Sequence, residues 1–446
     1  AETKFRAAGI RNVHCSTWHA FGYWWLAHQW GRRRLDERLG ADRLTMAVAR
    51  EALGVPFKET IAPGRHLSGY QIARLAQDAV EAFCISADSE LGPQHVKPVT
   101  GFGPAEHPVL VDVILSYARK AWADLTNPGG ILPMRGGHHL KAYSLADPYL
   151  NVGGNFPHVI MLDEAQDTDP ACNLIWSRQG GIRVAVGDSA QALYEWRGAV
   201  DALDRMARNA NVLHLTQSWR FGDEIAAEAN KWLTLLGERI HVRGNPAIRD
   251  TVGTFPQTRA ILCRTNGEAL QQVIDQQAQG RTVYLAGRAN EIAAFARAAA
   301  KLKAGEPCYH RDLIAYSTWG QVQEACDLGE MPDLEVLVHL VDSLTPEGLI
   351  AALDSCATTD RRADVTVSTV HGAKGLEWPT VRVGDDFKNP RRADGELADL
   401  DPGDIRAAYV AVTRAQHTLD VGSLDFADER LHPTRGFNRR GPYARL

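Results

Sequence analysis

The stretch VIMLDEAQDTDP, residues 159–170, runs a short apolar segment directly into two carboxylates, Asp163 and Glu164, with a third at Asp167. An apolar run of this length is typical of a buried strand in a parallel sheet. Such a strand delivers the residues that follow it to the carboxyl edge of the sheet, where α/β proteins bind their ligands. There Asp163 can hold Mg²⁺, directly or through water, and Glu164 can orient and deprotonate an attacking water. The alternative is a helix start with acidic residues in its first turn.

Seven further apolar runs predict strands, and most of them are followed by helix-compatible sequence. They are residues 183–186, 211–215, 260–263, 282–286, 365–369, 380–383 and 418–421. Strands that alternate with helices predict a parallel α/β architecture. Residues 27 to about 150 and about 290 to 360 break this alternation. Their mainly helical pattern predicts two insertions into the α/β units.

The composition is that of a globular chain with more than one domain. Of the 446 residues, 45% are hydrophobic and 23% are charged, as in ordinary globular proteins. A chain of this length is too long for a single hydrophobic core. The seven cysteines form no Cys-x-x-Cys pair, so neither a disulfide framework nor a zinc site is indicated, and a reducing compartment is favoured. The formal net charge of -5 argues against a generally basic nucleic-acid coat but leaves room for a local basic groove.

Neither a membrane span nor a histidine metal site is indicated. No apolar run approaches the roughly 20 residues of a membrane span, and AETKFRAAGI at residues 1–10 lacks the apolar core of a signal peptide. We therefore expect a cytosolic or nuclear protein. In RGGHHLKAY, residues 135–143, the adjacent histidines His138 and His139 point in different directions, so we expect an ordinary loop rather than a metal site.

A second motif, VGDSAQALYEWRGA at residues 186–199, again places Gly-Asp at the end of a predicted strand. The side-chain amide of Gln191 could sense a terminal phosphate. Tyr194, Trp196 and Arg197 offer aromatic faces and a cation of the kind that stack on unpaired bases. Taken alone, Trp196 is more often a core or interface residue than a platform for a base.

Three more motifs follow predicted strands or helices. LTQSWRFGDEIAAEAN, residues 215–230, puts Arg220 between a predicted strand and a predicted helix. VSTVHGAKGLEW, residues 367–378, follows a strand with a glycine-flanked turn that exposes its backbone. IRAAYVAVTRAQ, residues 405–416, predicts a helix that carries Arg414 near its end. A lone arginine is usually a surface charge, so only the order of these motifs gives them weight.

In this order the motifs DEAQD, GDxxQxxYxWRGA, QSWR, STxHGAKGLEW and YVAVTRA resemble those of the UvrD/Rep-like superfamily 1 DNA helicases. STWHAFG (16–22) and LKAYSLADPYL (140–150) look most like the F-box DNA helicase branch and its phage and bacterial relatives. The resemblance covers residues 14 to 420. It implies an α/β fold with two RecA-like parallel-sheet domains, the first N-terminally incomplete. These would be residues 1–208 with the insertion at about 27–150, and residues 209–446 with the insertion at about 290–360.

The resemblance also implies ATP and Mg²⁺ as cofactors, with a role for each matching residue. Asp163 would coordinate Mg²⁺, Glu164 would be the catalytic base, and Gln191 would couple the state of the γ-phosphate to DNA. Arg220 and Arg414 would be arginine fingers from the second domain. Two residues of the 367–378 motif would meet the nucleotide ribose: Gly375 and Glu377.

On the DNA side, the resemblance implies a single-strand track along which the protein translocates 3′ to 5′. The residues that would line it are Thr17, His19, Tyr194, Trp196, Arg197, Thr369 and His371. The implied partners are single-stranded DNA, DNA junctions and replication or recombination proteins. A monomer in the cytoplasm of a bacterial or phage-infected cell, associated with the nucleoid, is the corresponding expectation.

The sequence departs from the family in one respect. Such enzymes hold the β- and γ-phosphates in a GxxxxGK[ST] loop, and the 446 residues contain no Gly-Lys pair. In the family this phosphate cradle lies upstream of the segment that residues 1–22 resemble, so we expect it before Ala1. The alternative is a cradle-less, ATP-inactive protein of the same fold that binds single-stranded DNA or docks partners.

Overall fold

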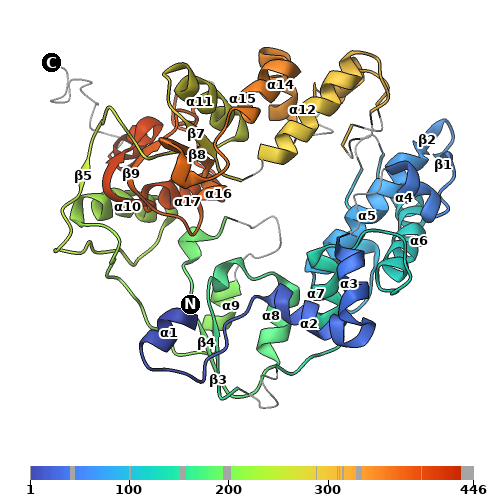
Figure 1. Ribbon diagram of the computed structural model, residues 1–446, viewed down its shortest axis with the longest axis horizontal. Coiled ribbons are helices and arrows are strands. Elements are labelled where there is room, and N and C mark those ends of the chain that lie inside the picture. Colours follow the sequence, from blue (N-terminus) through green and yellow to red (C-terminus); the bar gives the residue numbers. More distant parts are fainter. Residues whose placement is uncertain are drawn as a thin grey trace. The chain divides into compact units, whose positions relative to one another are not determined.

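The computed structural model of the chain describes residues 2–40, 46–99, 102–150, 157–193, 202–287, 289–308, 310, 312–313, 316–327, 334–392 and 394–432. The chain forms two compact units, which are described separately. Unit 1 comprises residues 1–188, 194–210 and 307–317, and unit 2 comprises residues 189–193, 211–306 and 318–446. Figure 1 labels their helices and strands. No helix in the described part of the chain is long and apolar enough to cross a membrane.

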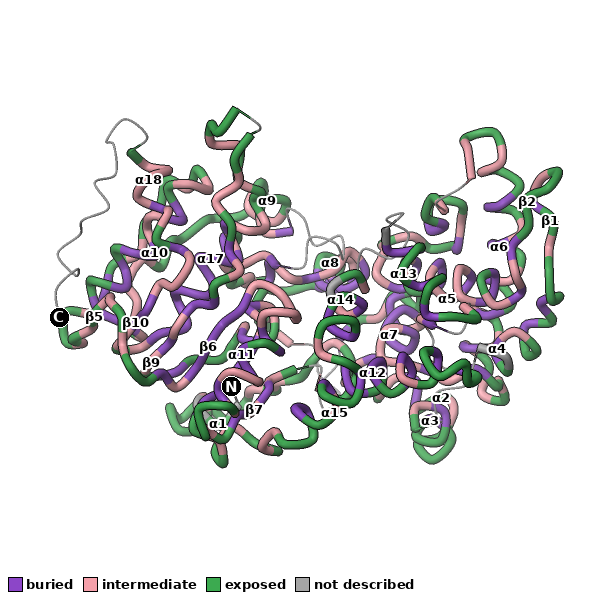
Figure 2. The backbone as a smooth tube through the Cα atoms, turned by 90° about the horizontal axis from the view of Figure 1, so that it is seen from above, coloured by how far each residue is buried: buried purple, intermediate pink, exposed green. Residues whose placement is uncertain are grey.

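A helical subdomain makes up much of unit 1. Its main helices are α5 (Gly69–Ile85), α6 (His107–Leu125) and α7 (Gly136–Leu145). Helix α5 begins in a capping box in which Ser68 and Gln71 each satisfy the backbone N–H of the other. One apolar face of α5 packs on α6, and Phe83 and Ile114 are fully buried there. Figure 2 colours the buried segments of these helices purple. The predicted helical character of this region is confirmed.

Four further helices lead into this subdomain: α1 (Glu2–Ala7), α2 (Trp18–Trp30), α3 (Arg32–Leu39) and α4 (Met46–Ala52). A hairpin of two antiparallel strands, β1 (Lys58–Ala62) and β2 (Arg65–Ser68), follows α4. The sequence analysis did not predict this hairpin, because each strand offers a single buried apolar side chain, Ile61 or Leu67.

The loop predicted around His138 and His139 is wrong, because both histidines lie in helix α7 and are buried. The side chain of His138 accepts a hydrogen bond from the backbone N–H of Arg135 and so caps the first turn of the helix. The two glycines that start α7 favour a loop in the sequence, and tertiary packing overrides that preference.

The remainder of unit 1 contains a two-stranded parallel sheet of β3 (Val159–Leu162) and β4 (Ile182–Ala185). Helix α8 (Pro170–Ser177) connects the strands, and α9 (Ala202–Ala207) follows them. Both strands lie where the sequence predicted them, and the acidic residues after β3 follow a strand and do not begin an α-helix. Trp18 of α2 packs against the apolar cluster of Leu162 and Trp176.

Unit 2 is built on a six-stranded sheet in the order β5-β10-β9-β6-β8-β7, with every pairing parallel. The strands are β5 (Thr251–Val252), β6 (Ala260–Cys263), β7 (Val283–Leu285), β8 (Val365–Thr369), β9 (Trp378–Val383) and β10 (Ala415–Asp420). The predicted parallel α/β architecture is therefore confirmed. Only the two-residue strand β5 was not predicted, and such a short edge strand carries no periodic signal.

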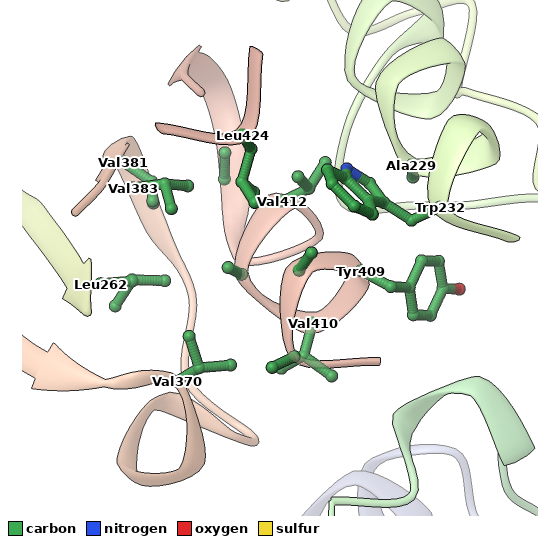
Figure 3. Packing of buried hydrophobic residues seen from close by; sticks show 14 of the residues in the cluster. Ala229, Trp232, Leu262, Val370, Val381, Val383, Tyr409, Val410, Val412 and Leu424 are labelled. Atoms are coloured by element: carbon green, nitrogen blue, oxygen red, sulfur yellow. The ribbon is translucent and has the colours of Figure 1, made fainter. Parts of the chain in front are cut away.

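Helices cover both faces of this sheet. The helices α10 (Asp223–Leu236) and α17 (Pro402–Val412) pack on one face and enclose Trp232, Tyr409, Leu262, Val381 and Val383 (Figure 3). Helix α11 (Asn266–Ala278) packs against β6 and β8. Because both faces are covered, every residue of β6 is buried, as expected for a central parallel strand.

A second helical region consists of α12 (Ala289–Lys303), α13 (Trp319–Asp327), α14 (Glu335–Leu344) and α15 (Pro346–Asp354). Asp342 joins three of them, because its carboxylate accepts hydrogen bonds from Lys303 Nζ at 2.8 Å, Trp319 Nε1 at 2.7 Å and Gln323 Nε2 at 2.7 Å. The predicted helical pattern of this region is confirmed. Helix α18 (Ala427–Leu431) follows β10 and packs on α10.

The strand predicted at residues 211–215 is wrong. This segment is irregular, and Leu213 and Leu215 are 88% and 89% exposed. A strand requires a ladder partner for its backbone. Among the described residues, the nearest β-bridge to this segment lies just after it, where Gln217 pairs with Arg243. Its apolar spacing indicated a strand, but pairing depends on tertiary neighbours.

Candidate functional site

The carboxylates Asp163 and Glu164 follow β3 at its carboxyl end, and both are exposed. Glu164 has φ 53° and ψ 44°, the left-handed conformation that a residue with a Cβ rarely adopts. The turn is held by the N–H of Ala165, which donates to Val186 O at 2.9 Å, and by the N–H of Asp167, which donates to Glu164 O at 3.0 Å. Strained backbone of this kind concentrates at functional sites.

A buried glutamine, Gln166, orients the carboxylate of Glu164. Its Nε2 donates to Glu164 Oε2 at 2.5 Å, and its Oε1 accepts from the N–H of Asp188 at 3.1 Å. Gln166 lies in the 3₁₀ turn η2 (Ala165–Asp167) and is 2% exposed. It thus links the ends of β3 and β4. The sequence analysis passed over Gln166, although a polar side chain between two acids after a strand was a signal for it.

The carboxyl ends of β3 and β4 suit a magnesium ion that also binds phosphate. Mg²⁺ in such sites takes one or two carboxylates and fills its other positions with water and phosphate oxygens. Asp163 and Asp188 supply carboxylates at neighbouring strand ends. No cluster of three or more His, Cys, Asp or Glu side chains occurs in the described part of the chain, which this mode of binding does not require.

In unit 2, the segment from Thr369 to Glu377 crosses the sheet. Because β8 and β9 both pair in parallel with β6, the end of β8 and the start of β9 lie at opposite edges. Thr369 caps the short helix α16 (Val370–Ala373) by accepting from Gly372 N, and His371 lies within that helix. Gly375 then takes φ 78° in a turn that leads to Glu377 at the amino edge. Thr369, expected to contact DNA, and Glu377, expected to contact the ribose, therefore lie at opposite edges of the sheet.

Glu377 is held by two side chains at the amino edge of the sheet. Its Oε2 accepts from Arg220 Nε at 2.5 Å, and its Oε1 accepts from Gln416 Nε2 at 3.0 Å. Arg220 also donates through Nη1 to Thr413 O at 2.9 Å. The hydrogen bond from Arg220 lowers the pKa of Glu377 below its usual range, so this carboxylate stays ionised at neutral pH.

Arg414 lies just beyond the C-terminus of α17 and is 2% exposed. Its Nε donates to Val410 O at 3.1 Å, and its Nη2 donates to Thr413 Oγ1 at 3.1 Å and to Gln191 Oε1 at 3.1 Å. A buried guanidinium needs such partners for its donors. The sequence placed Arg414 inside a helix that ends at residue 416, whereas α17 ends at Val412, which frees Arg414 to meet Gln191.

Gln191 ends the 3₁₀ turn η3 (Ser189–Gln191), which belongs to unit 2 although the strand before it, β4, belongs to unit 1. The buried residues Ala190 and Leu193 join the apolar core of unit 2. Unit 2 therefore brings together four of the predicted nucleotide residues: Gln191, Arg220, Glu377 and Arg414. Asp163 and Glu164 lie in unit 1.

Trp219, next to Arg220, was not predicted as a functional residue. It is 80% exposed, while Arg220 beside it turns toward Glu377. The exposed face of an indole can stack on a planar base. The signal was present in the sequence, because the motif places tryptophan directly before the arginine.

Of the residues predicted to contact DNA, Thr17 and His19 lie at the start of α2. Thr17 caps the helix by accepting from Ala20 N at 3.2 Å. His19 is fixed by two contacts with the α7 region, Nδ1 with Gly136 O at 3.1 Å and its carbonyl with His139 Nε2 at 2.9 Å. Tyr194, Trp196 and Arg197 lie outside the described residues.

Comparison with known proteins found matches to two helicase family models. Residues 150–209 match the family model described as the UvrD/REP helicase N-terminal domain, and residues 323–423 match the UvrD-like helicase C-terminal domain. The resemblance to UvrD-like helicases is thus confirmed. These domains are RecA-like α/β domains, which agrees with the two parallel sheets.

Among individual proteins, the chain is similar to two named F-box DNA helicases. It is 26% identical over 452 residues to F-box DNA helicase protein 1 of Schizosaccharomyces pombe, covering 92% of this chain and 50% of that protein. It is 25% identical over 450 residues to F-box DNA helicase 1 of Gallus gallus, covering 92% of this chain and 42% of that protein. The chain spans about half the length of these curated relatives.

Proposed function

We propose that this protein is a DNA-dependent ATPase that translocates 3′ to 5′ along single-stranded DNA and unwinds duplex DNA. The observation that carries the proposal is the segment 369–377 of unit 2. It bears Thr369 and His371 at one edge of the sheet and Glu377, bound to Arg220, at the other. A rigid element with DNA residues at one end and nucleotide residues at the other can couple the two activities. The helicase domains at residues 150–209 and 323–423 support it.

In this proposal, residues at the sheet ends of the chain bind and hydrolyse ATP. Mg²⁺ entering with ATP would supply positive charge that offsets the charge of the phosphates. Asp163 would ligate the metal, and Glu164, oriented by Gln166, would deprotonate the attacking water. Arg220 and Arg414 would stabilise the charge that develops on the phosphate, and Gln191, bonded to Arg414, would sense it.

The nucleotide itself would be held by the amino edge of the unit 2 sheet. Glu377, ionised at neutral pH, would accept a hydrogen bond from a ribose hydroxyl, and the free backbone at Gly375 would allow close approach. Trp219 would stack on the base, with Arg220 beside it directed to the phosphates.

We further propose that residues 1–208 form the first RecA-like domain and 209–446 the second, with insertions at about 27–150 and 290–360. The 446 residues contain no Gly-Lys pair, so the proposal assigns no phosphate cradle among them.

The DNA side would use the residues named in the motifs. Thr17 and His19 at the start of α2 and Thr369 and His371 at α16 would contact the strand, with Tyr194, Trp196 and Arg197 stacking on its bases. Partners would be single-stranded DNA, DNA junctions and proteins of replication, repair or recombination. We propose a monomer that works in the DNA-containing compartment, the cytoplasm in a bacterial or phage-infected cell.

Duplexes with a single-stranded tail on one end test the direction of movement. The protein, expressed from its own start codon, is mixed with ATP and Mg²⁺ and with duplexes that carry either a 3′ or a 5′ tail. Strand displacement on the 3′-tailed duplex alone, lost in Glu164→Gln, is the expected result. Strand displacement on the 5′-tailed duplex alone would show that the protein moves in the opposite direction. Strand displacement without ATP would contradict the proposed motor function.

A second candidate is an ATP-inactive protein of the same fold that binds single-stranded DNA or docks partners. The lack of any Gly-Lys pair in the 446 residues favours it. It predicts salt-dependent strand binding without ATP turnover, even when the protein is expressed from its own start codon. Turnover that depends on DNA and on Glu164 would exclude this candidate.

A further inference from the structure

Lys374 occupies the middle of the segment that crosses the unit 2 sheet. It is the C-cap of α16, three residues after His371 and three before Glu377. Its Nζ donates to the main-chain carbonyl of Gln191 at 2.6 Å. This contact joins residues that are 183 positions apart in the chain, so local sequence does not explain it.

Gln191 is therefore held at two points. Lys374 binds its main chain, and Arg414 binds its side chain through Nη2 and Oε1 at 3.1 Å. Arg414 is itself tied to the same segment, because its carbonyl accepts from Trp378 N at 3.0 Å. If residues 369–378 move, Lys374 transmits the movement to the main chain of Gln191. Arg414 transmits it to the side-chain amide of Gln191.

The packing beneath these contacts makes the arrangement rigid. Ala190 and Leu193, on either side of Gln191, share one apolar cluster with Val370 and Ala373 of α16. An ammonium on a four-carbon stem is a point donor, and its hydrogen bonds to oxygen are charge-assisted and stronger than neutral ones. Lys374 can therefore fix the position of the turn at Gln191 relative to α16.

We propose that Lys374 is a positioning residue that couples occupancy of the DNA track at Thr369 and His371 to the placement of Gln191 in the ATP site. The proposal rests on the proposed function and adds a residue to it. DNA bound at α16 would hold residues 369–378 in one position. Through its hydrogen bond, Lys374 would then hold Gln191 in the matching position without itself contacting ATP.

The test compares Lys374→Met, which keeps the stem and removes the charge, with Lys374→Arg, which keeps a cationic donor. Lys388→Met serves as the matched control, because Lys388 is an exposed lysine of the same unit with no ion pair or hydrogen bond to the described residues. Each protein, expressed from its own start codon, is assayed for basal and DNA-stimulated ATP hydrolysis, KM for ATP and affinity for single-stranded DNA.

Loss of a hydrogen bond to a charged group corresponds to roughly a tenfold change or more. Lys374→Met is expected to lower the DNA stimulation of kcat by about tenfold, with basal kcat, KM and DNA affinity within about threefold of wild type. Lys374→Arg is expected to recover most of the stimulation, and Lys388→Met is expected to match wild type. Hydrogen exchange supplies a direct readout: DNA should slow exchange at residues 189–193 in wild type but not in Lys374→Met.

Two outcomes overturn the inference. Full DNA stimulation in Lys374→Met would show that the contact carries no coupling. An equal fall in basal and stimulated hydrolysis, or a loss of DNA affinity, would show a structural role or a direct DNA contact instead. A wild-type protein that DNA does not stimulate would instead contradict the proposed function, so the two failures are distinguishable.

Discussion

Arg220 and Glu377 are 157 positions apart in the chain, yet Arg220 Nε lies 2.5 Å from Glu377 Oε2. The pair joins the segment before α10 to the segment before β9, and Gln416 closes the other side of the carboxylate. Both side chains remain partly exposed, 32% for Arg220 and 46% for Glu377. The pair is therefore available to a ligand at the amino edge of the sheet.

Glu377→Gln is expected to weaken ATP binding with little effect on stability. A partly exposed ion pair contributes less than about 1 kcal/mol, so the melting temperature should change by only a few degrees. The KM for ATP should rise, because the neutral amide is a weaker acceptor and no longer fixes Arg220. Steady-state kinetics and thermal unfolding check both points. A large fall in melting temperature with unchanged KM would assign the pair to folding alone.

Trp219→Ala is expected to raise the KM for ATP roughly tenfold, because stacking on a base contributes about 1 to 3 kcal/mol. Affinity for single-stranded DNA should stay the same, as measured by fluorescence anisotropy. Trp24→Ala is the matched control, since Trp24 is also an exposed tryptophan but belongs to unit 1. Equal effects of the two substitutions on KM would argue against a base-stacking role for Trp219.

Gly244→Ala is expected to destabilise unit 2, because a Cβ there would overlap the backbone of Gly222 and Asp223. Overpacking of this kind costs about 1 to 3 kcal/mol and would displace the segment that carries Arg220. Gly253→Ala is the control, because no described atom outside Gly253 and its two chain neighbours lies within 4 Å of its Cβ position. Urea unfolding measures the difference. Equal stabilities for the two variants would contradict the close approach of the backbones.

Acid should destabilise the helical subdomain through His138. Burial lowers the pKa of His138 to about 4 from 6.5, and its Nδ1 accepts from Arg135 N. Because the pKa is lower in the folded state, the stabilisation is present above pH 6.5 and is lost as pH falls toward 4. At pH 5 the loss is about 2 kcal/mol. Urea unfolding of wild type and His138→Gln at pH 7.5 and 5 checks this, and an equal acid loss in both would exclude His138 as the cause.

The strands that carry the site could be predicted from the sequence, because an apolar run marks each of them: β3, β4, β6, β8, β9 and β10. Their ends fixed which residues meet at each sheet edge. The segment 211–215 has the same apolar pattern but finds no ladder among the described residues, because pairing is a tertiary property.

Contacts between distant segments could not be predicted. Nothing in the sequence spacing of Lys374 and Gln191, or of Gln416 and Glu377, indicates a hydrogen bond. Each of these hydrogen bonds depends on how distant segments pack in unit 2. The role of Gln166 was equally hidden, because it depends on the left-handed turn at Glu164. Sequence patterns predict where a residue lies along a strand, whereas side-chain partners follow from packing.

The most direct test of the account is ATP hydrolysis with and without single-stranded DNA, measured for the protein expressed from its own start codon and for its Glu164→Gln variant. The account predicts hydrolysis that DNA stimulates, and a fall of about 100-fold or more in kcat for the variant, which should still bind ATP and DNA. Strand binding without hydrolysis in wild type, or undiminished hydrolysis in the variant, would contradict it.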